Sequence, residues 1–93
     1  MNNGETVPVT IELFGVPRLR AGVGLLRVDA ASVSAALLAL GNACPALEGA
    51  VVERGRLMPS YRLSLNGERF VSEPETPLSA GDVLLLLSAD VGG

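Results

Sequence analysis

The fold is decided by a stretch near the start of the chain, Val7-Pro8-Val9-Thr10-Ile11-Glu12-Leu13-Phe14. Apolar residues alternate with less apolar ones along it, which is the period of a strand that is buried on one face. Phe14 breaks the alternation, because it falls on the polar face. The glycines and proline of residues 15–24 then indicate a loop. We expect residues 25–28 to return beside the first strand, as a hairpin with a long, irregular tip.

A second apolar stretch, residues 83–87, carries large apolar side chains on both faces of one strand. Leu84 and Leu86 point one way, and Val83, Leu85 and Leu87 point the other. One set must meet the core, and the other is either covered by a second layer or exposed as a surface for a partner. Phe14 would join that exposed surface. The alternative is that residues 48–60 fold back over it.

One helix and one tight turn are indicated between these strands. Ser32 is placed to cap a helix over residues 33–43, whose buried stripe comprises Val33, Ala36, Leu37 and Leu40. Residues 61–65 alternate again and run into Asn66-Gly67, the preferred pair for a type I′ turn. Residues 68–71 then form the returning strand. In residues 48–60, Val51-Val52 fits either a short strand or a helical turn.

This order of elements predicts an α+β domain, with a mixed sheet of four to five strands packed on one main helix. The first and last strands lie side by side in parallel at its centre, and one face of the sheet stays open. No linker or internal repeat divides the sequence. Residues 1–93 are therefore expected to form a single domain with a flexible tail at residues 88–93.

The composition excludes several classes of function. The chain has 93 residues, of which 48% are hydrophobic, too many for a disordered segment. Its formal charge of −3 argues against a nucleic-acid-binding protein. Histidine and lysine are absent, which removes imidazole acid–base catalysis, Schiff-base chemistry and the commonest metal ligand. No metal site is expected.

The single cysteine, Cys44, forms no internal disulfide, and no histidine is present to activate it, so we interpret it as structural. A reducing, cytoplasmic location is expected. Residues 1–6 do not resemble a signal peptide, and the apolar runs are too short to span a membrane. Two basic doublets, Arg18 with Arg20 and Arg54 with Arg56, fall in expected loops. They would steer an acidic partner, although solvated surface arginine is the simpler interpretation.

The sequence ends in Gly92-Gly93, shortly after the apolar strand. A terminal carboxylate that another enzyme activates must pass through a narrow channel to a nucleotide. Residues without a Cβ atom fit such a channel and reach backbone angles that other residues do not. The alternative is a chain end without a function.

Together these residues resemble the MoaD/ThiS ubiquitin-like sulfur-carrier family, which includes the molybdopterin synthase small subunit, the thiamine sulfur carrier and carriers of cysteine biosynthesis. The resemblance rests on Leu65-Asn66-Gly67, Thr76-Pro77-Leu78, Gly81-Asp82, the last apolar strand and Val91-Gly92-Gly93. The opening resembles the molybdopterin synthase small subunit, with Phe14 followed by Arg18 and Gly22. The tail departs from that branch, which usually has aromatic and proline residues where this chain has Leu86-Leu87-Ser88-Ala89-Asp90.

The resemblance implies a β-grasp fold and a function as a protein co-substrate rather than an enzyme. A partner E1-like enzyme, which uses ATP, would adenylate the carboxylate of Gly93, and a sulfur donor would convert it to a thiocarboxylate. The carrier itself would bind no cofactor. The tail, with Gly92, would then enter the large catalytic subunit of molybdopterin synthase. The implied partner surface comprises Phe14, Phe70, Leu87 and Val91.

Three alternatives stay open. In the first, the sulfur serves cysteine, thiamine or another thio-metabolite. In the second, the chain is a ubiquitin-like modifier joined through Gly93 to lysines of other proteins. In the third, it is an interaction domain whose final glycines have no function.

Overall fold

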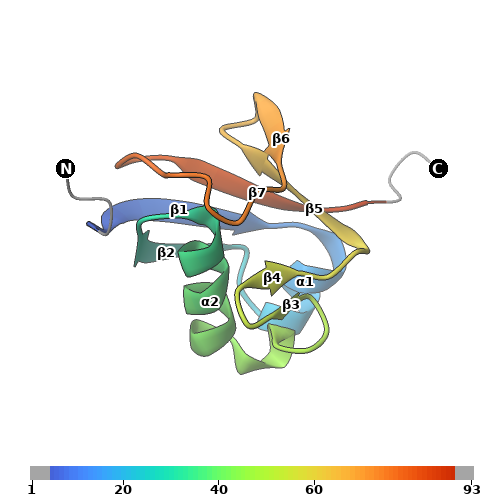
Figure 1. Ribbon diagram of the computed structural model, residues 1–93. Coiled ribbons are helices and arrows are strands. Elements are labelled where there is room, and N and C mark those ends of the chain that lie inside the picture. The colour runs from blue at the N-terminus through green and yellow to red at the C-terminus, as the bar shows by residue number, and fades with distance from the viewer. Residues whose placement is uncertain (1–4, 90–93) are drawn as a thin grey trace.

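The computed structural model describes residues 5–89, which form two layers, a sheet and the elements beneath it (Figure 1). The five-stranded sheet has the order β2-β1-β7-β5-β6. The bounds are Leu25–Ala30 for β2, Val7–Leu13 for β1, Val83–Ser88 for β7, Tyr61–Leu65 for β5 and Arg69–Val71 for β6. The predicted α+β architecture and strand number are confirmed.

The first and last strands form the centre of the sheet. β1 runs parallel to β7, with Thr10 beside Val83 and Leu13 beside Leu86, and β2 returns antiparallel to β1. Each of the two central strands therefore pairs with a neighbouring strand on both of its edges. The expected parallel pair is confirmed. The side chains that β1 and β7 turn toward the helix layer are almost inaccessible: Val9, Ile11, Leu13, Leu84 and Leu86.

The main helix is α2, Val33–Ala43, and it begins where the sequence predicts. The hydroxyl of Ser32 accepts a hydrogen bond from the backbone N of Ala35 at 3.2 Å. The first free N–H groups of the helix, on Val33 and Ser34, donate to carbonyl oxygens in the loop before β7 at 3.0 and 2.9 Å. This loop therefore fixes the start of α2 against the sheet. The predicted stripe is buried: Val33, Ala36, Leu37 and Leu40.

The predicted turn at Asn66-Gly67 is also confirmed, and a second turn precedes β7. Asn66 and Gly67 have φ of 57° and 69°, as a type I′ turn requires, and they join β5 to β6. Gly81 has φ of 89°, and the carboxylate of Asp82 accepts a hydrogen bond from the backbone N of Ser79 at 2.8 Å. These contacts start β7 at its observed position.

The prediction of an irregular hairpin tip between β1 and β2 is wrong. The chain forms a seven-residue helix there, α1, Gly15–Ala21. Pro17 lies in the first turn, where a backbone N–H is not needed, and its side chain is buried. Gly22 ends the helix with φ of 78°, and its N–H donates to the carbonyl of Arg18 at 3.0 Å.

Residues 48–60 lie on the helix side of the sheet, after a short 3₁₀ helix, η1, Pro45–Leu47. They contain a small hairpin of β3, Val52–Glu53, and β4, Arg56–Leu57, which lies beside α2 in Figure 1. Val51 and Val52 are fully buried. The alternative in which this segment covers the outer face of the sheet is therefore wrong, and its ambiguous Val-Val pair leads into a strand.

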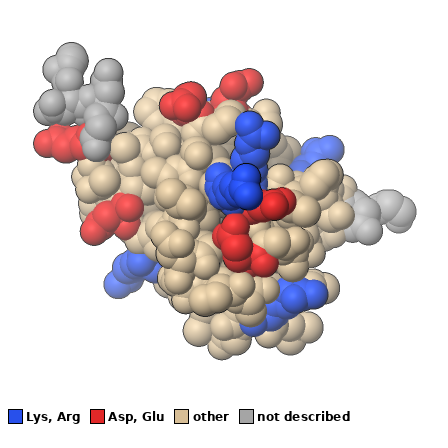
Figure 2. Space-filling model, turned by 60° about the horizontal axis from the view of Figure 1, so that its bottom comes forward, with Lys and Arg blue, Asp and Glu red and all other residues tan. Residues whose placement is uncertain are grey.

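Charged side chains are interspersed on the face seen in Figure 2, where arginines lie near acidic residues.

Among residues 5–89, no helix is long and apolar enough to cross a bilayer.

Candidate functional site

The outer face of the sheet carries apolar side chains that neither helix covers. On β7, Leu84 and Leu86 are fully buried, whereas Leu85 and Leu87 point to the outer face and remain half-buried. Because side chains alternate along a strand, this difference between neighbours identifies Leu85 and Leu87 as surface residues.

Phe14 and Leu87 lie at the same end of the two central strands. The register pairs Leu13 with Leu86, and Phe14 and Leu87 follow directly on their parallel strands. Phe14 has an extended backbone, with φ of −129° and ψ of 153°. Its side chain therefore points away from that of buried Leu13, toward the outer face, and it is 37% exposed.

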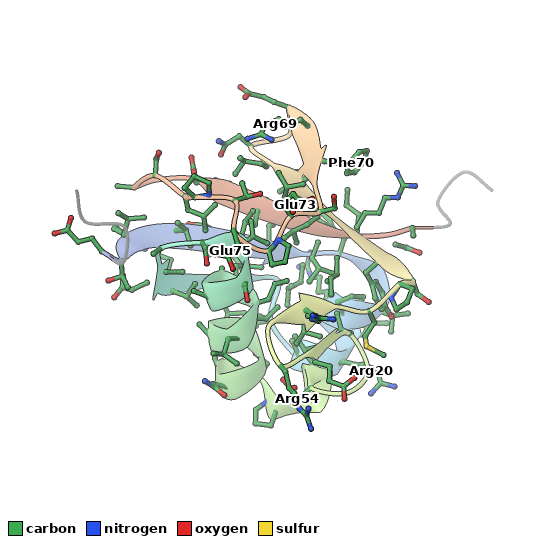
Figure 3. All side chains as sticks on the ribbon, in the orientation of Figure 1. Arg20, Arg54, Arg69, Phe70, Glu73 and Glu75 are labelled. Atoms are coloured by element: carbon green, nitrogen blue, oxygen red, sulfur yellow. The ribbon has the colours of Figure 1, made fainter. Side chains whose placement is uncertain are left out.

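Arg62 connects this pair to the edge of the sheet. It is the register partner of Leu87, and its guanidinium carbon lies 5.3 Å from the centroid of the Phe70 ring. This is within the range of a cation–π contact. Phe70 is 59% exposed and stands out from β6 in Figure 3. We call the set Phe14, Leu85, Leu87, Arg62 and Phe70 the open-face strip.

Three of the four partner-surface residues expected from the sequence belong to this strip, Phe14, Leu87 and Phe70. Val91 lies outside the described residues, as do Gly92 and Gly93. Arg62 was not expected. The alternation of residues 61–65 places it on the outer face, and the hairpin predicted at Asn66-Gly67 brings the strand of Phe70 beside it. Its place beside Leu87 depends on the pairing of β5 with β7, which no feature of the sequence reveals.

The strip lies beside the path of the chain toward its C-terminus. β7 ends at Ser88, and the backbone N of Ala89 donates to the carbonyl oxygen of Ser60 at 2.7 Å. The chain is thus held against the end of β5 as far as Ala89. Phe14 and Leu87 therefore lie near the last residues of the chain that the structure describes.

The strip suits recognition of a protein. Its side chains offer apolar area and one guanidinium, the residue types that anchor protein interfaces. Within residues 5–89, no group of three or more His, Cys, Asp or Glu residues is arranged to hold a metal ion. The thiol of Cys44 is free and half-buried, after the end of α2.

Searches of family models and of curated proteins give no match. Solved structures do match. Small archaeal modifier protein 1 from Haloferax volcanii is 34% identical, over 92% of this chain and 99% of that chain, with a TM-score of 0.78. The protein of that name from Methanosarcina acetivorans is 28% identical, over 97% of this chain and 100% of that chain, with a TM-score of 0.81.

A molybdopterin-converting factor shares the fold. One chain in the structure of the complex of its subunits 1 and 2 from Helicobacter pylori is 22% identical. The match covers 94% of this chain and 100% of that chain, with a TM-score of 0.64. These neighbours have the ubiquitin-like β-grasp fold, in agreement with the sheet and helix described above. Given its identity with the Haloferax volcanii protein over nearly the full length of both, the chain belongs to the MoaD/ThiS family of ubiquitin-like sulfur carriers and modifiers.

Proposed function

We propose that this protein is a sulfur carrier whose reacting group is the carboxylate of Gly93. An E1-like enzyme binds the tail, and the carboxylate attacks the α-phosphorus of ATP and releases pyrophosphate. Sulfur at the oxidation level of sulfide then attacks the acyl carbon of the adenylate, and AMP leaves. The product is a thiocarboxylate. The carrier is the substrate of these steps, and the groups that activate ATP belong to the partner.

The proposal rests on the position of the open-face strip. β7 is a central strand of the sheet and also leads toward Gly92-Gly93. Phe14 and Leu87 lie at its end, so a partner that docks on them binds only a few residues before Gly93 in the sequence. A rigid docking surface next to a short tail reduces the orientational freedom that the tail must lose on binding. The two glycines fit a narrow channel, because they lack Cβ atoms.

We further propose that the protein that accepts the sulfur is the large catalytic subunit of molybdopterin synthase. The Helicobacter pylori neighbour is a complex of subunits 1 and 2 of molybdopterin-converting factor, so this fold is found paired with a second subunit. In this chain the open-face strip would form the contact. Because activation consumes ATP, the proposal places the protein in the cytoplasm. An acceptor that makes cysteine, thiamine or another thio-metabolite would use the same activation step.

A second candidate function is that of a protein modifier, favoured by the 34% identity with small archaeal modifier protein 1. In this case a lysine amine of a target attacks the carbonyl carbon of the Gly93 adenylate, loses a proton and forms an isopeptide bond as AMP leaves. The two functions share the adenylation step and differ in the nucleophile that follows it.

Exchange of pyrophosphate into ATP by the cognate E1-like enzyme tests the shared step. We expect exchange with the full chain and none with a variant that lacks Gly92 and Gly93. Absence of exchange with the full chain would overturn both functions. Addition of the large subunit and the pterin precursor then tests whether the large subunit is the protein that accepts the sulfur. A ladder of high-mass adducts in cells, lost on deletion of the two glycines, would instead support the modifier.

A further inference from the structure

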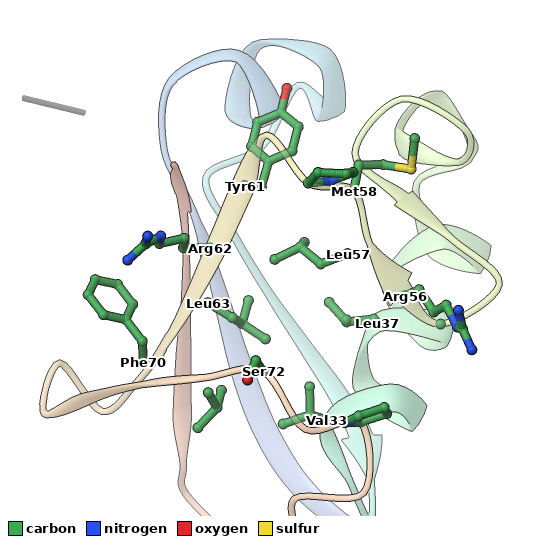
Figure 4. A pocket seen from close by; sticks show the side chains of 14 residues that line it. Val33, Leu37, Arg56, Leu57, Met58, Tyr61, Arg62, Leu63, Phe70 and Ser72 are labelled. Atoms are coloured by element: carbon green, nitrogen blue, oxygen red, sulfur yellow. The ribbon is translucent and has the colours of Figure 1, made fainter. Parts of the chain in front are cut away.

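A groove of about 710 Å³ lies between β4 and β5, and Arg62 and Phe70 of the open-face strip line one side of it (Figure 4). Val33 and Leu37 of α2 contribute to its floor, together with Leu63 of β5 and Val71 of β6. All four side chains are buried in the core, so the floor is rigid as well as apolar. Leu57 and Tyr61, which are half-buried, line its sides.

The two banks of the groove are strand edges. β4 pairs with β3 alone among the described strands, and the backbone N of Met58 donates to the carbonyl of Val51 at 2.9 Å. Because backbone groups alternate between the two sides of a strand, the N–H and C=O of Leu57 face away from β3, toward the groove.

The same reasoning applies to β5. Its pairing with β6 covers Leu63, Ser64 and Leu65 only. The carbonyl of Ser60 points toward β7, where it accepts from the backbone N of Ala89. The carbonyl of Tyr61 therefore points the opposite way, to the groove side, beyond the end of β6. One bank thus presents the N–H and C=O of Leu57 to the groove, and the other presents the carbonyl of Tyr61.

The charge of the groove has one sign. The charged residues among those that line it are Arg56 and Arg62, one on each bank, and no Asp or Glu is among them. Both arginines are exposed. This local charge is opposite to that of the whole chain, which is −3. Guanidinium groups form their strongest hydrogen bonds with carboxylates, so the groove complements an acidic ligand.

We propose that this groove binds an extended, acidic segment of a partner protein. The segment adds along the edge of β4 through the backbone groups of Leu57. Alternate apolar side chains enter the floor, and the carboxylates between them reach Arg56 and Arg62. This inference goes beyond the proposed function, because it requires neither the tail nor the transfer of sulfur.

Selection of peptides from a random library displayed on phage, with the full chain as bait, tests this proposal. We expect the enriched peptides to alternate apolar residues with Asp or Glu. Arg56→Glu should weaken their binding by about tenfold or more, because a charge-assisted contact becomes a repulsion. Arg69→Glu makes the same change of charge on β6, outside the groove, and should change the affinity by less than about twofold.

A second readout locates the bound peptide. Hydrogen exchange at the amide of Leu57 should slow when a selected peptide is added. The proposal is overturned if no peptide is enriched, if the enriched peptides lack acidic residues, or if Arg56→Glu and Arg69→Glu weaken binding equally. It is also overturned if exchange at Leu57 is unchanged, or if the chain forms a dimer without peptide that Arg56→Glu dissociates.

Discussion

The side-chain nitrogen Nδ2 of Asn66 donates a hydrogen bond to Oδ1 of Asp82 at 3.1 Å, which ties the β5–β6 turn to the loop before β7. Oδ1 of Asn66 also accepts from the backbone N of Val83 at 2.8 Å. One side chain thus joins two segments that are far apart in the sequence, and it does so from a residue with φ of 57°.

We therefore predict that Asn66→Ala lowers the free energy of unfolding by about 2–4 kcal/mol. The substitution removes these hydrogen bonds, and it leaves alanine, whose side chain forms no hydrogen bond, in the left-handed region of backbone angles. Asn66→Gly loses the same hydrogen bonds without the backbone strain, so it should cost about 1–2 kcal/mol. Urea denaturation measures both. Equal effects of the two substitutions would contradict the role assigned to the backbone.

Gly55 and Gly22 provide a matched pair, since both have φ of 78°. A Cβ atom on Gly55 would lie 2.9 Å from the hydroxyl oxygen and 3.0 Å from the carbonyl oxygen of Ser34, whereas a Cβ on Gly22 would meet no atom within 4 Å. Gly22→Ala should cost about 1 kcal/mol of stability, and Gly55→Ala about 1–3 kcal/mol more. Thermal denaturation of the two variants compares them. A smaller loss at Gly55 would show that the β3–β4 hairpin does not hold its position against α2.

Leu84 and Leu85 are neighbours that face opposite sides of the sheet. Leu84 is fully buried in the core, and Leu85 is half-buried on the outer face. Leu84→Ala should lower the unfolding free energy by about 2–5 kcal/mol, because it leaves a cavity in the core. Leu85→Ala should lower it by only about 1 kcal/mol, because truncation of a half-buried side chain leaves little or no cavity. Chemical denaturation measures the difference. The opposite order would mean that a second layer covers the outer face.

Phe70 and Leu38 test the open-face strip. Both side chains are large, apolar and exposed, at 59% and 48%, but Leu38 lies on α2. Each alanine variant should change stability by less than about 1 kcal/mol. Phe70→Ala should weaken binding of the large subunit by about tenfold, as expected for an aromatic anchor, and Leu38→Ala should not. Calorimetric titration of both variants measures this. Equal affinities would remove Phe70 from the partner surface.

Elements with strong local signals were predictable from the sequence. The alternation of β1, the Ser32 cap of α2 and the Asn66-Gly67 turn each depend on residues close together in the chain. The short α1 helix was missed, because its sequence contains Gly15 and Pro17, which indicate a loop; burial of Pro17 against the rest of the fold stabilises it. The β3–β4 turn was also unclear, since Arg54 takes a φ of 52°, which arginine seldom adopts.

In the candidate site, the sequence pattern identified only residues that stand out within their own strand. Phe14 and Leu87 stand out because each breaks the usual alternation of its own strand. The position of Arg62 beside Leu87 depends on the pairing of β5 with β7, and the groove depends on how β4 lies against β5. Both are products of tertiary packing, for which neither segment carries a local pattern.

The mass of the intact protein, after incubation with the cognate E1-like enzyme, ATP and a sulfur donor, tests the central proposal most directly. The account predicts a gain equal to the replacement of one oxygen by sulfur, located at Gly93 by fragmentation and absent from a variant that ends at Gly92. An unchanged mass, while the same enzyme hydrolyses ATP in response to this chain, would contradict it.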